Sequence, residues 1–173
     1  MSAKNPWFWL VATAAVALDR LTKVWAVAQL APGESIALWP GVFHLTLVKN
    51  SGAAFSLFAG GSDWLKWISL LVSVGLCIYA LVGPYLGSWE QMGFGLLLGG
   101  AVGNGFDRFA FGEVTDFLDF RLIQFPVFNG ADIAINLGLA CLLIGTLRSE
   151  SRTPAPARPA AKQIREPTDT TGG

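Results

Sequence analysis

Four long apolar runs dominate the pattern of hydrophobic and polar positions along the chain. They cover about residues 7–30, 64–83, 92–106 and 131–147. A helix needs about 20 mostly apolar residues to cross the core of a bilayer, and three of the runs come close to or exceed that length. The pattern predicts a membrane protein, mainly α, with four transmembrane helices.

The first run begins like a cleaved signal peptide. Lys4 precedes an apolar stretch that contains Ala-Thr-Ala at residues 12–14, the kind of small-residue segment at which such peptides are cut. The apolar residues continue well past this segment, however, and three charged residues interrupt them: Asp19, Arg20 and Lys23. We therefore interpret the run as a retained span.

The short third run carries Gly95, Gly99 and Gly103 at four-residue spacing. On a helix these positions form a ridge without side chains, and small residues at this spacing let membrane helices approach closely. We expect this run to pack tightly against a neighbouring helix.

Composition agrees with a membrane protein. Of the 173 residues, 53% are hydrophobic and 14% are charged, against roughly 25% charged in a soluble domain. Twelve Lys and Arg balance twelve Asp and Glu, so the basic surface that nucleic-acid binding requires is not expected. Each of the two cysteines, Cys77 and Cys141, lies in an apolar run without a second Cys or His nearby, and we expect neither a disulfide framework nor a metal or other cofactor.

Basic residues near the ends of the runs predict the orientation. Lys4 precedes the first run, and five bases follow the fourth: Arg148, Arg152, Arg158, Lys162 and Arg165. Because basic residues favour the cytoplasmic side, both termini are expected there. The two long connections, at about residues 31–63 and 108–128, then lie outside. We predict one membrane domain over residues 1–148, with an outer β region at about 31–63. Residues 149–173 read as a disordered, dispensable tail.

A strand and a turn are predicted inside the first outer connection. Residues 42–48 are rich in β-forming side chains and are followed by Asn50-Ser51-Gly52. The segment is apolar on both faces. Such a strand suits a sheet that lies on the membrane surface or clasps an apolar substrate, but burial against the helices explains it equally well.

Ionisable groups inside the runs need a partner or a function, because each costs about 2.5–3.5 kcal/mol on insertion scales. Asp19 and Lys23 share a helical face. They form either a self-contained ion pair, whose lysine extends to the outer interface, or a device that holds a substrate or an active-site loop. Asn104 and Arg108 also share a face if the third helix continues that far; the alternative is an arginine anchored at lipid headgroups.

Two aspartates on the outer side fit an acid–base pair. In a strand, Asp116 and Asp119 point to opposite faces, and burial beside apolar neighbours would raise the pKa of Asp116. Asp132 falls in the first turn of a helix capped by Asn129, where the ionised form is favoured. Asp132 could serve that cap alone, but capping does not explain Asn136. As a pair, one carboxylate would activate water while the other protonates the substrate carbonyl.

Other chemistries have less support. The single histidine, His44, has no acidic neighbour in its strand, which weakens a Ser-His-Asp arrangement. A Ser–Lys dyad could combine Ser51 or Ser56 with a lysine, but the spacing singles out no pair among Lys23, Lys49 and Lys66. The alternative function is that of a non-enzymatic membrane protein, a small proton-linked transporter in which Asp19, Asp116 and Asp132 pass protons.

Five segments in order resemble the bacterial lipoprotein signal peptidases, the signal peptidase II family. Together they span most of residues 7–147. The segments are DRLTK at 19–23, NSGAAFS at 50–56, GGAVGN at 99–104 with Asp107-Arg108, VTDF at 114–117, and FNGAD at 128–132.

The resemblance implies a membrane aspartic endopeptidase with Asp116 and Asp132 as its catalytic dyad. It implies supporting or substrate-binding roles for Asp19, Lys23, Asn50, Gly52, Asn104, Arg108, Asn129 and Ala131. The implied substrate is a prolipoprotein whose cysteine carries diacylglycerol, cut just before that cysteine. The implied setting is the bacterial inner membrane, with membrane lipid as a partner and the site near the extracytoplasmic face. Oligomeric state is not indicated.

Two residues depart from the family pattern. Thr115 stands where a β-branched aliphatic residue is common, and we expect its hydroxyl to bond to Asp116. Gly105 stands where a bulkier residue is usual, and we expect it to loosen the end of the third helix.

Overall fold

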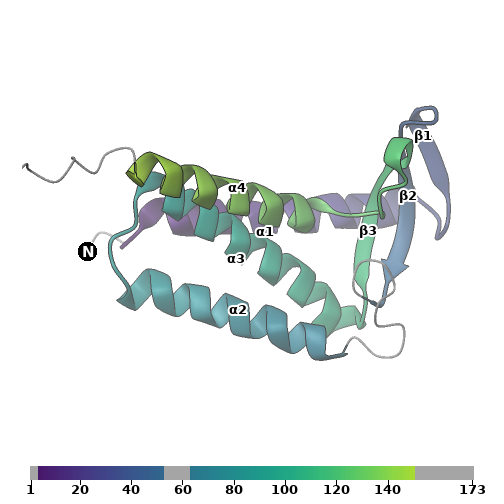
Figure 1. The fold of residues 1–173 in the computed structure, drawn as a ribbon. Coiled ribbons are helices and arrows are strands. Elements are labelled where there is room, and N and C mark those ends of the chain that lie inside the picture. The colour runs from purple at the N-terminus through teal and green to yellow at the C-terminus, as the bar shows by residue number, and fades with distance from the viewer. Residues whose placement is uncertain (1–3, 53–62, 151–173) are drawn as a thin grey trace, which may run out of the picture.

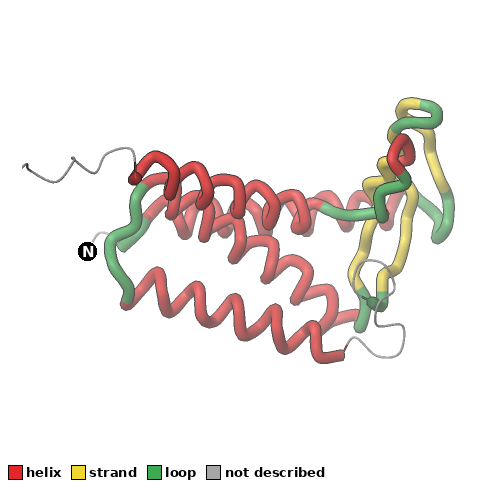
Figure 2. Tube along the Cα trace, viewed as in Figure 1, coloured by secondary structure: helices red, strands yellow, loops and turns green. Residues whose placement is uncertain are grey.

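The computed structural model describes residues 4–52 and 63–150. Within them, four helices run side by side and a small sheet lies across one end of the bundle (Figure 1; Figure 2). The helices are α1 (Pro6–Gln29), α2 (Asp63–Val82), α3 (Ser88–Phe111) and α4 (Gly130–Glu150). The mainly helical fold with a small β region is as predicted. The predicted tail lies outside the described residues from 151 onward.

Helix α3 is the centre of the bundle, packing against α1, α2 and α4. Its glycines make these contacts possible. A Cβ at Gly95 would lie 2.7 Å from the carbonyl oxygen of Phe8 in α1, and one at Gly99 would overlap the Cβ of Ala15. Toward α4, a Cβ at Gly100 would lie 2.5 Å from the carbonyl oxygen of Ala131. The predicted ridge is confirmed on the side of α1, and the α4 side has a contact of the same kind.

Helix α3 is longer than the apolar run that predicted it. It starts at Ser88, where the N–H of Gly87 donates to Oε2 of Glu90 (2.7 Å), and it ends before Gly112, whose φ of 76° favours glycine. Helix α3 continues past Gly105 and ends at Phe111. A Cβ at Gly105 would lie 2.9 Å from the Cβ of Ser69, so Gly105 allows α2 to approach.

The sheet has the order β1-β2-β3 and is antiparallel. The strands are β1 (Ser35–Trp39), β2 (Phe43–Asn50) and β3 (Val114–Phe120). Strand β2 is the predicted strand, whereas β1 was not predicted. Register places Val48 opposite Asp116 and Lys49 opposite Thr115.

One buried cluster joins the sheet to the end of α1. It consists of Ala26, Leu30, Leu45, Leu47 and Phe117. Burial against a helix therefore accounts for part of the apolar character of β2. A short 3₁₀ helix, η2 (Arg121–Ile123), follows β3, and Phe128 then pairs with Leu118 before α4 begins. This path brings the start of α4 back beside β3.

Two of the helices are long and apolar enough to cross a membrane by length and composition, over Trp64–Val82 and Gly130–Arg148. Large apolar side chains stay exposed on the bundle surface, including Leu71 at 72% and Val82 at 79%. A bundle with so much apolar surface is typical of a protein whose solvent is hydrocarbon.

Candidate active site

A cavity of about 1030 Å³ opens between the sheet and the outer ends of α3 and α4. Here "outer" denotes the end of the bundle that carries the sheet. Asp116 and Asp132 both line this cavity, together with Asn50, Asn104 and Arg108. Residues far apart in sequence thus meet at the place where the sequence predicted polar chemistry.

Asp116 lies on β3 and is 3% exposed. Its Oδ2 accepts a hydrogen bond from Nδ2 of Asn50 (2.9 Å), and its Oδ1 accepts one from Nδ2 of Asn129 (2.6 Å). Burial raises the pKa of Asp116 to about 6, with the charge of Asp132 adding to the rise and the two asparagine bonds opposing it. Asp116 can therefore hold a proton near neutral pH.

Asp132 lies in the first turn of α4 and also caps that helix. Its Oδ2 accepts the backbone N–H of Asn129 (3.1 Å), and its own N–H donates to Oδ1 of Asn129 (3.1 Å). The predicted cap at Asn129 is confirmed. The second carboxylate oxygen of Asp132, Oδ1, accepts a hydrogen bond from Nδ2 of Asn104 (2.9 Å). Asp132 caps the helix and lines the cavity at once, so the two readings of this residue are compatible.

Two asparagine side chains connect the carboxylates. Nδ2 of Asn129 donates both to Asp116 and to Oδ1 of Asn104 (3.1 Å), and Nδ2 of Asn104 donates to Asp132. The ammonium of Lys23 donates to Oδ1 of Asn104 (2.9 Å). Because an ammonium can only donate, it fixes the orientation of this amide and leaves Nδ2 facing Asp132.

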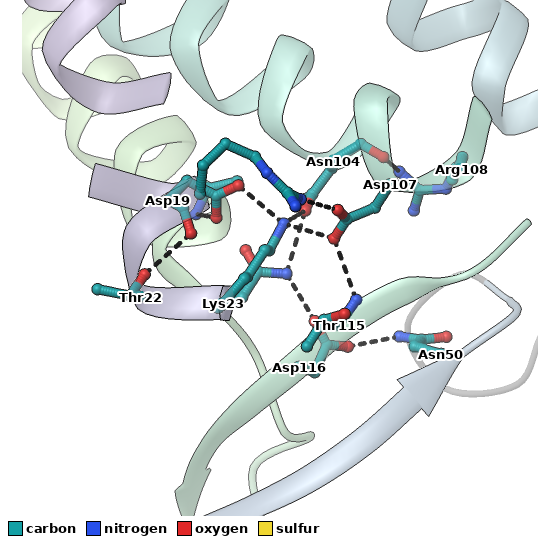
Figure 3. A network of polar contacts seen from close by, with 12 residues as sticks. Asp19, Thr22, Lys23, Asn50, Asn104, Asp107, Arg108, Thr115 and Asp116 are labelled. Carbon is teal, nitrogen blue, oxygen red and sulfur yellow. Dashed lines mark hydrogen bonds and ion pairs between the residues drawn. The ribbon is translucent and has the colours of Figure 1, made fainter. Parts of the chain in front are cut away.

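Lys23 is held deep in the bundle. It is 1% exposed and lies 2.9 Å from Oδ2 of Asp19 and 3.0 Å from Oδ2 of Asp107 (Figure 3). The interpretation in which Lys23 extends to the outer interface is therefore wrong, since two buried carboxylates hold its ammonium. Asp19 also accepts the N–H of Ala131 (2.9 Å) and so fastens the start of α4 to α1.

Asp107 was not among the predicted site residues. It is 0% exposed, forms an ion pair with Arg20 as well as Lys23, and its Oδ2 accepts the N–H of Thr115 (3.2 Å). It thus ties the end of α3 to the residue that precedes Asp116. Its place three residues after Asn104, on a predicted helix, was the available signal.

The remaining predicted residues lie around the cavity. Nη1 of Arg108 donates to the carbonyl oxygen of Asn104 (3.3 Å), and its guanidinium is close enough to Asp116 and Asp132 to be influenced by both charges. The N–H of Gly52 donates to Oδ1 of Asn50 (3.0 Å), which turns Nδ2 of Asn50 toward Asp116. The structure brings all ten predicted residues into one connected region.

Thr115 does not bond to Asp116. Its hydroxyl accepts Nζ of Lys49 (3.0 Å), its partner across the strands. Neighbouring side chains on a strand point to opposite faces, so the hydroxyl and the Asp116 carboxylate are directed apart.

The alternative groups are engaged elsewhere. His44 contacts Oγ of Ser35 (3.2 Å) and the N–H of Gly41 (3.3 Å). Lys23 and Lys49 bind the partners described above, and Ser56 lies outside the described residues. Over residues 4–52 and 63–150, no group of three or more His, Cys, Asp or Glu is placed to hold a metal ion.

Comparison with known proteins agrees with this architecture. The family model described as signal peptidase (SPase) II matches residues 11–148. A lipoprotein signal peptidase of Gloeobacter violaceus is 95% identical over 173 residues, the full length of both chains. One of Thermosynechococcus vestitus is 63% identical over 143 residues, covering 81% of this chain and 90% of the relative. A solved bacterial membrane enzyme, 27% identical, covers 86% of this chain and 93% of its own, with a TM-score of 0.75.

Proposed function

The chain belongs to the signal peptidase II family of lipoprotein signal peptidases, and on that basis we propose that Asp116 and Asp132 are the catalytic pair of an aspartic endopeptidase. The observation that carries this proposal is their joint position in one cavity, connected through Asn104 and Asn129. Family membership makes the chain a protease and favours this function over a proton-linked transporter.

The two aspartates have different environments, as an acid and a base require. Burial raises the pKa of Asp116 to about 6, which favours the protonated acid. Asp132, in the first turn of α4, accepts the side-chain N–H of Asn104 and the backbone N–H of Asn129, and we assign it the role of the base. Asp132 takes a proton from a water molecule, and the oxygen of this water attacks the scissile carbonyl carbon. In the same step Asp116 gives its proton to the carbonyl oxygen. When the tetrahedral intermediate collapses, the C–N bond breaks, Asp132 gives its proton to the leaving amine, and a hydroxyl group of the intermediate returns a proton to Asp116.

Arg108 is the charged neighbour of this pair. It reaches the cavity from the last turn of α3, and its side chain keeps donors beyond the one given to Asn104. We assign it a substrate-positioning role, in which the guanidinium binds a carbonyl of the substrate.

The proposed substrate is a prolipoprotein whose cysteine carries diacylglycerol, cut just before that cysteine. The cavity lies at one end of a bundle with an apolar surface, and apolar side chains join its polar wall: Val48, Val114, Phe125, Phe128, Ile133 and Leu137. A membrane-bound signal segment with acyl chains would be presented to such a cavity from within the bilayer. We place all four helices across the bacterial inner membrane, with cytoplasmic termini and an extracytoplasmic sheet.

The experiment is cleavage of a diacylglyceryl-modified precursor by the purified protein in detergent. Asp116→Asn and Asp132→Asn should each abolish turnover while the protein still folds, and a chelator should leave the wild-type rate intact. Asp119→Asn is the matched control, because this aspartate of the same strand bonds instead to Thr46 and Arg121. Retained turnover in either member of the pair would reject the assignment.

A further inference from the structure

Asn136 is a polar residue of the cavity wall that the catalytic pair does not use. It lies on α4 one turn beyond Asp132, beside Ile133 and Leu137, and its side chain is exposed. Its Nδ2 donates to the carbonyl oxygen of Asp132 (2.9 Å). Among the described residues no donor reaches its Oδ1. One N–H and the amide oxygen therefore remain available.

Thr146 shows what an ordinary polar residue on this helix does. Its hydroxyl donates to the carbonyl oxygen of Leu142, four residues earlier, at 3.0 Å. That single bond uses the only donor of the side chain. Asn136 makes the same bond but keeps a second donor and an acceptor, at a position that faces the cavity. The bond to the helix backbone therefore does not explain why the side chain of Asn136 has a second donor and an amide oxygen.

The substrate of a membrane protease needs partners of this kind. A helix satisfies its own backbone groups, but the segment to be cut must be extended at the scissile bond. Each unpaired peptide group in hydrocarbon costs several kcal/mol. After its bond to the Asp132 carbonyl, the side-chain amide of Asn136 still offers one donor and one acceptor, the complement of a peptide group.

Direction along α4 identifies the part of the substrate that would pass Asn136. Helix α4 starts beside the sheet and runs away from it (Figure 1), so Asn136 lies farther from the sheet than Asp132. A signal peptide spans the membrane with its cut end at the outer side. The segment beside Asn136 is then the one that immediately precedes the scissile bond.

We propose that Asn136 is a substrate-binding residue that pairs with an exposed peptide group of the signal peptide, on the N-terminal side of the cut. This inference rests on the proposed function. It adds a residue that recognises the peptide backbone of the substrate and not the substrate's side chains.

The first test compares Asn136→Leu with Thr146→Val in the cleavage assay. Loss of a hydrogen bond of ordinary strength raises KM for Asn136→Leu roughly tenfold and leaves kcat within about twofold. Thr146→Val keeps both constants. Thermal unfolding should show both variants folded, since leucine is the stronger helix former. Wild-type KM in folded Asn136→Leu would overturn the proposal.

The second test changes the substrate. Precursors are prepared with one peptide N–H replaced by an ester oxygen at each of the three bonds before the cut. At one position the ester should lower kcat/KM for the wild type roughly fivefold or more. For Asn136→Leu the loss should be less than about twofold, because the variant already lacks the side chain with which that peptide N–H would form its hydrogen bond. Equal losses in both proteins at all three positions would overturn the pairing. Absence of cleavage by the wild type would instead refute the proposed function.

Discussion

The inner and outer halves of α1, α3 and α4 are held together by opposite kinds of contact. In the inner half, away from the sheet, small residues allow the backbones to touch, as where Gly95 meets Phe8 and Gly99 meets Ala15. In the outer half, an ion cluster joins α1 to α3: the buried Asp19, Lys23 and Asp107 with the partly exposed Arg20. Asp19 of this cluster also accepts the backbone N–H of Ala131 in α4.

The difference shows how this bundle separates packing from chemistry. In lipid the hydrophobic effect does little to hold helices together, so close packing and interhelical polar bonds must do so. The inner half sets the distance between the helix axes. The outer half fixes the orientation of the side chains that surround the aspartate pair. The two halves should therefore respond differently to substitution.

The largest effect is expected in the inner half, for Gly99→Leu. A Cβ at this position already overlaps that of Ala15 and lies 3.1 Å from the carbonyl oxygen of Ala12. Because both neighbours belong to the tightly packed α1, the two helices must separate. We expect a loss of about 4 kcal/mol or more in the free energy of unfolding, measured by thermal or denaturant unfolding in detergent.

Gly75→Leu is the control for this change. A Cβ at Gly75 on α2 meets nothing within 4 Å, so the same substitution should leave the unfolding transition nearly unchanged. Equal destabilisation by the two leucines would show that the glycine contact does not set the spacing of α1 and α3.

Lys23→Met breaks the outer half. It leaves Asp19 and Asp107 buried without the ammonium that lies within 3.0 Å of both. Removing one partner of a buried ion pair costs about 3–5 kcal/mol. The activity should fall as well, since Lys23 orients Asn104. Arg121→Met breaks the partly exposed pair with Asp119 and should cost no more than about 1 kcal/mol. A similar loss for both would remove the distinction between buried and exposed pairs.

The sequence predicted the two halves unequally. The spacing of Gly95 and Gly99 alone predicted the inner contact, whereas Gly103, third in the same series, lies against Asp19 of the outer half. The ends of α3 were not predicted because polar residues there interrupt the apolar pattern. These polar residues bind groups that are distant in the sequence. Oε1 of Gln91 accepts the N–H of Trp7 (3.1 Å), and Asp107 binds bases of α1.

In the outer half, short motifs located the aspartate pair but not its connections. The role of Asp107 depends on the N–H of Thr115, a contact between a helix and a strand that no spacing rule specifies. Strand β1 was missed for a similar reason. All five of its residues are exposed, so it has no buried face to give a pattern, and it is specified by pairing with β2.

Asp116→Asn should separate stability from activity in the outer half. The folded protein raises the pKa of Asp116 from 3.8 to about 6. A raised pKa means that the folded state holds the proton more tightly. The stability due to this group is therefore present below about pH 4 and is lost as the pH rises through about 6.

Asparagine has no charge to desolvate and avoids this loss. Its NH2 group opposes one of the two asparagine donors, but that cost does not change with pH. The variant should be inactive, and its stability relative to the wild type should be about 2 kcal/mol greater at pH 8 than at pH 4.5. Unfolding measured at both pH values checks this, with Asp119→Asn as the reference. A gain that does not change with pH would argue against a buried, proton-holding Asp116.

The smallest effect is expected for Thr115→Val, at the edge of the outer half. The methyl group keeps the volume of the buried side chain, and the N–H bond to Asp107 involves only the backbone. The substitution removes the acceptor of the Lys49 ammonium. Lys49 is exposed and can bind water instead, so unfolding should shift by less than about 1 kcal/mol and kcat/KM should change less than about threefold. A tenfold loss of activity would mean that the Lys49–Thr115 bond, and not Asp107 alone, holds β3 in place for catalysis.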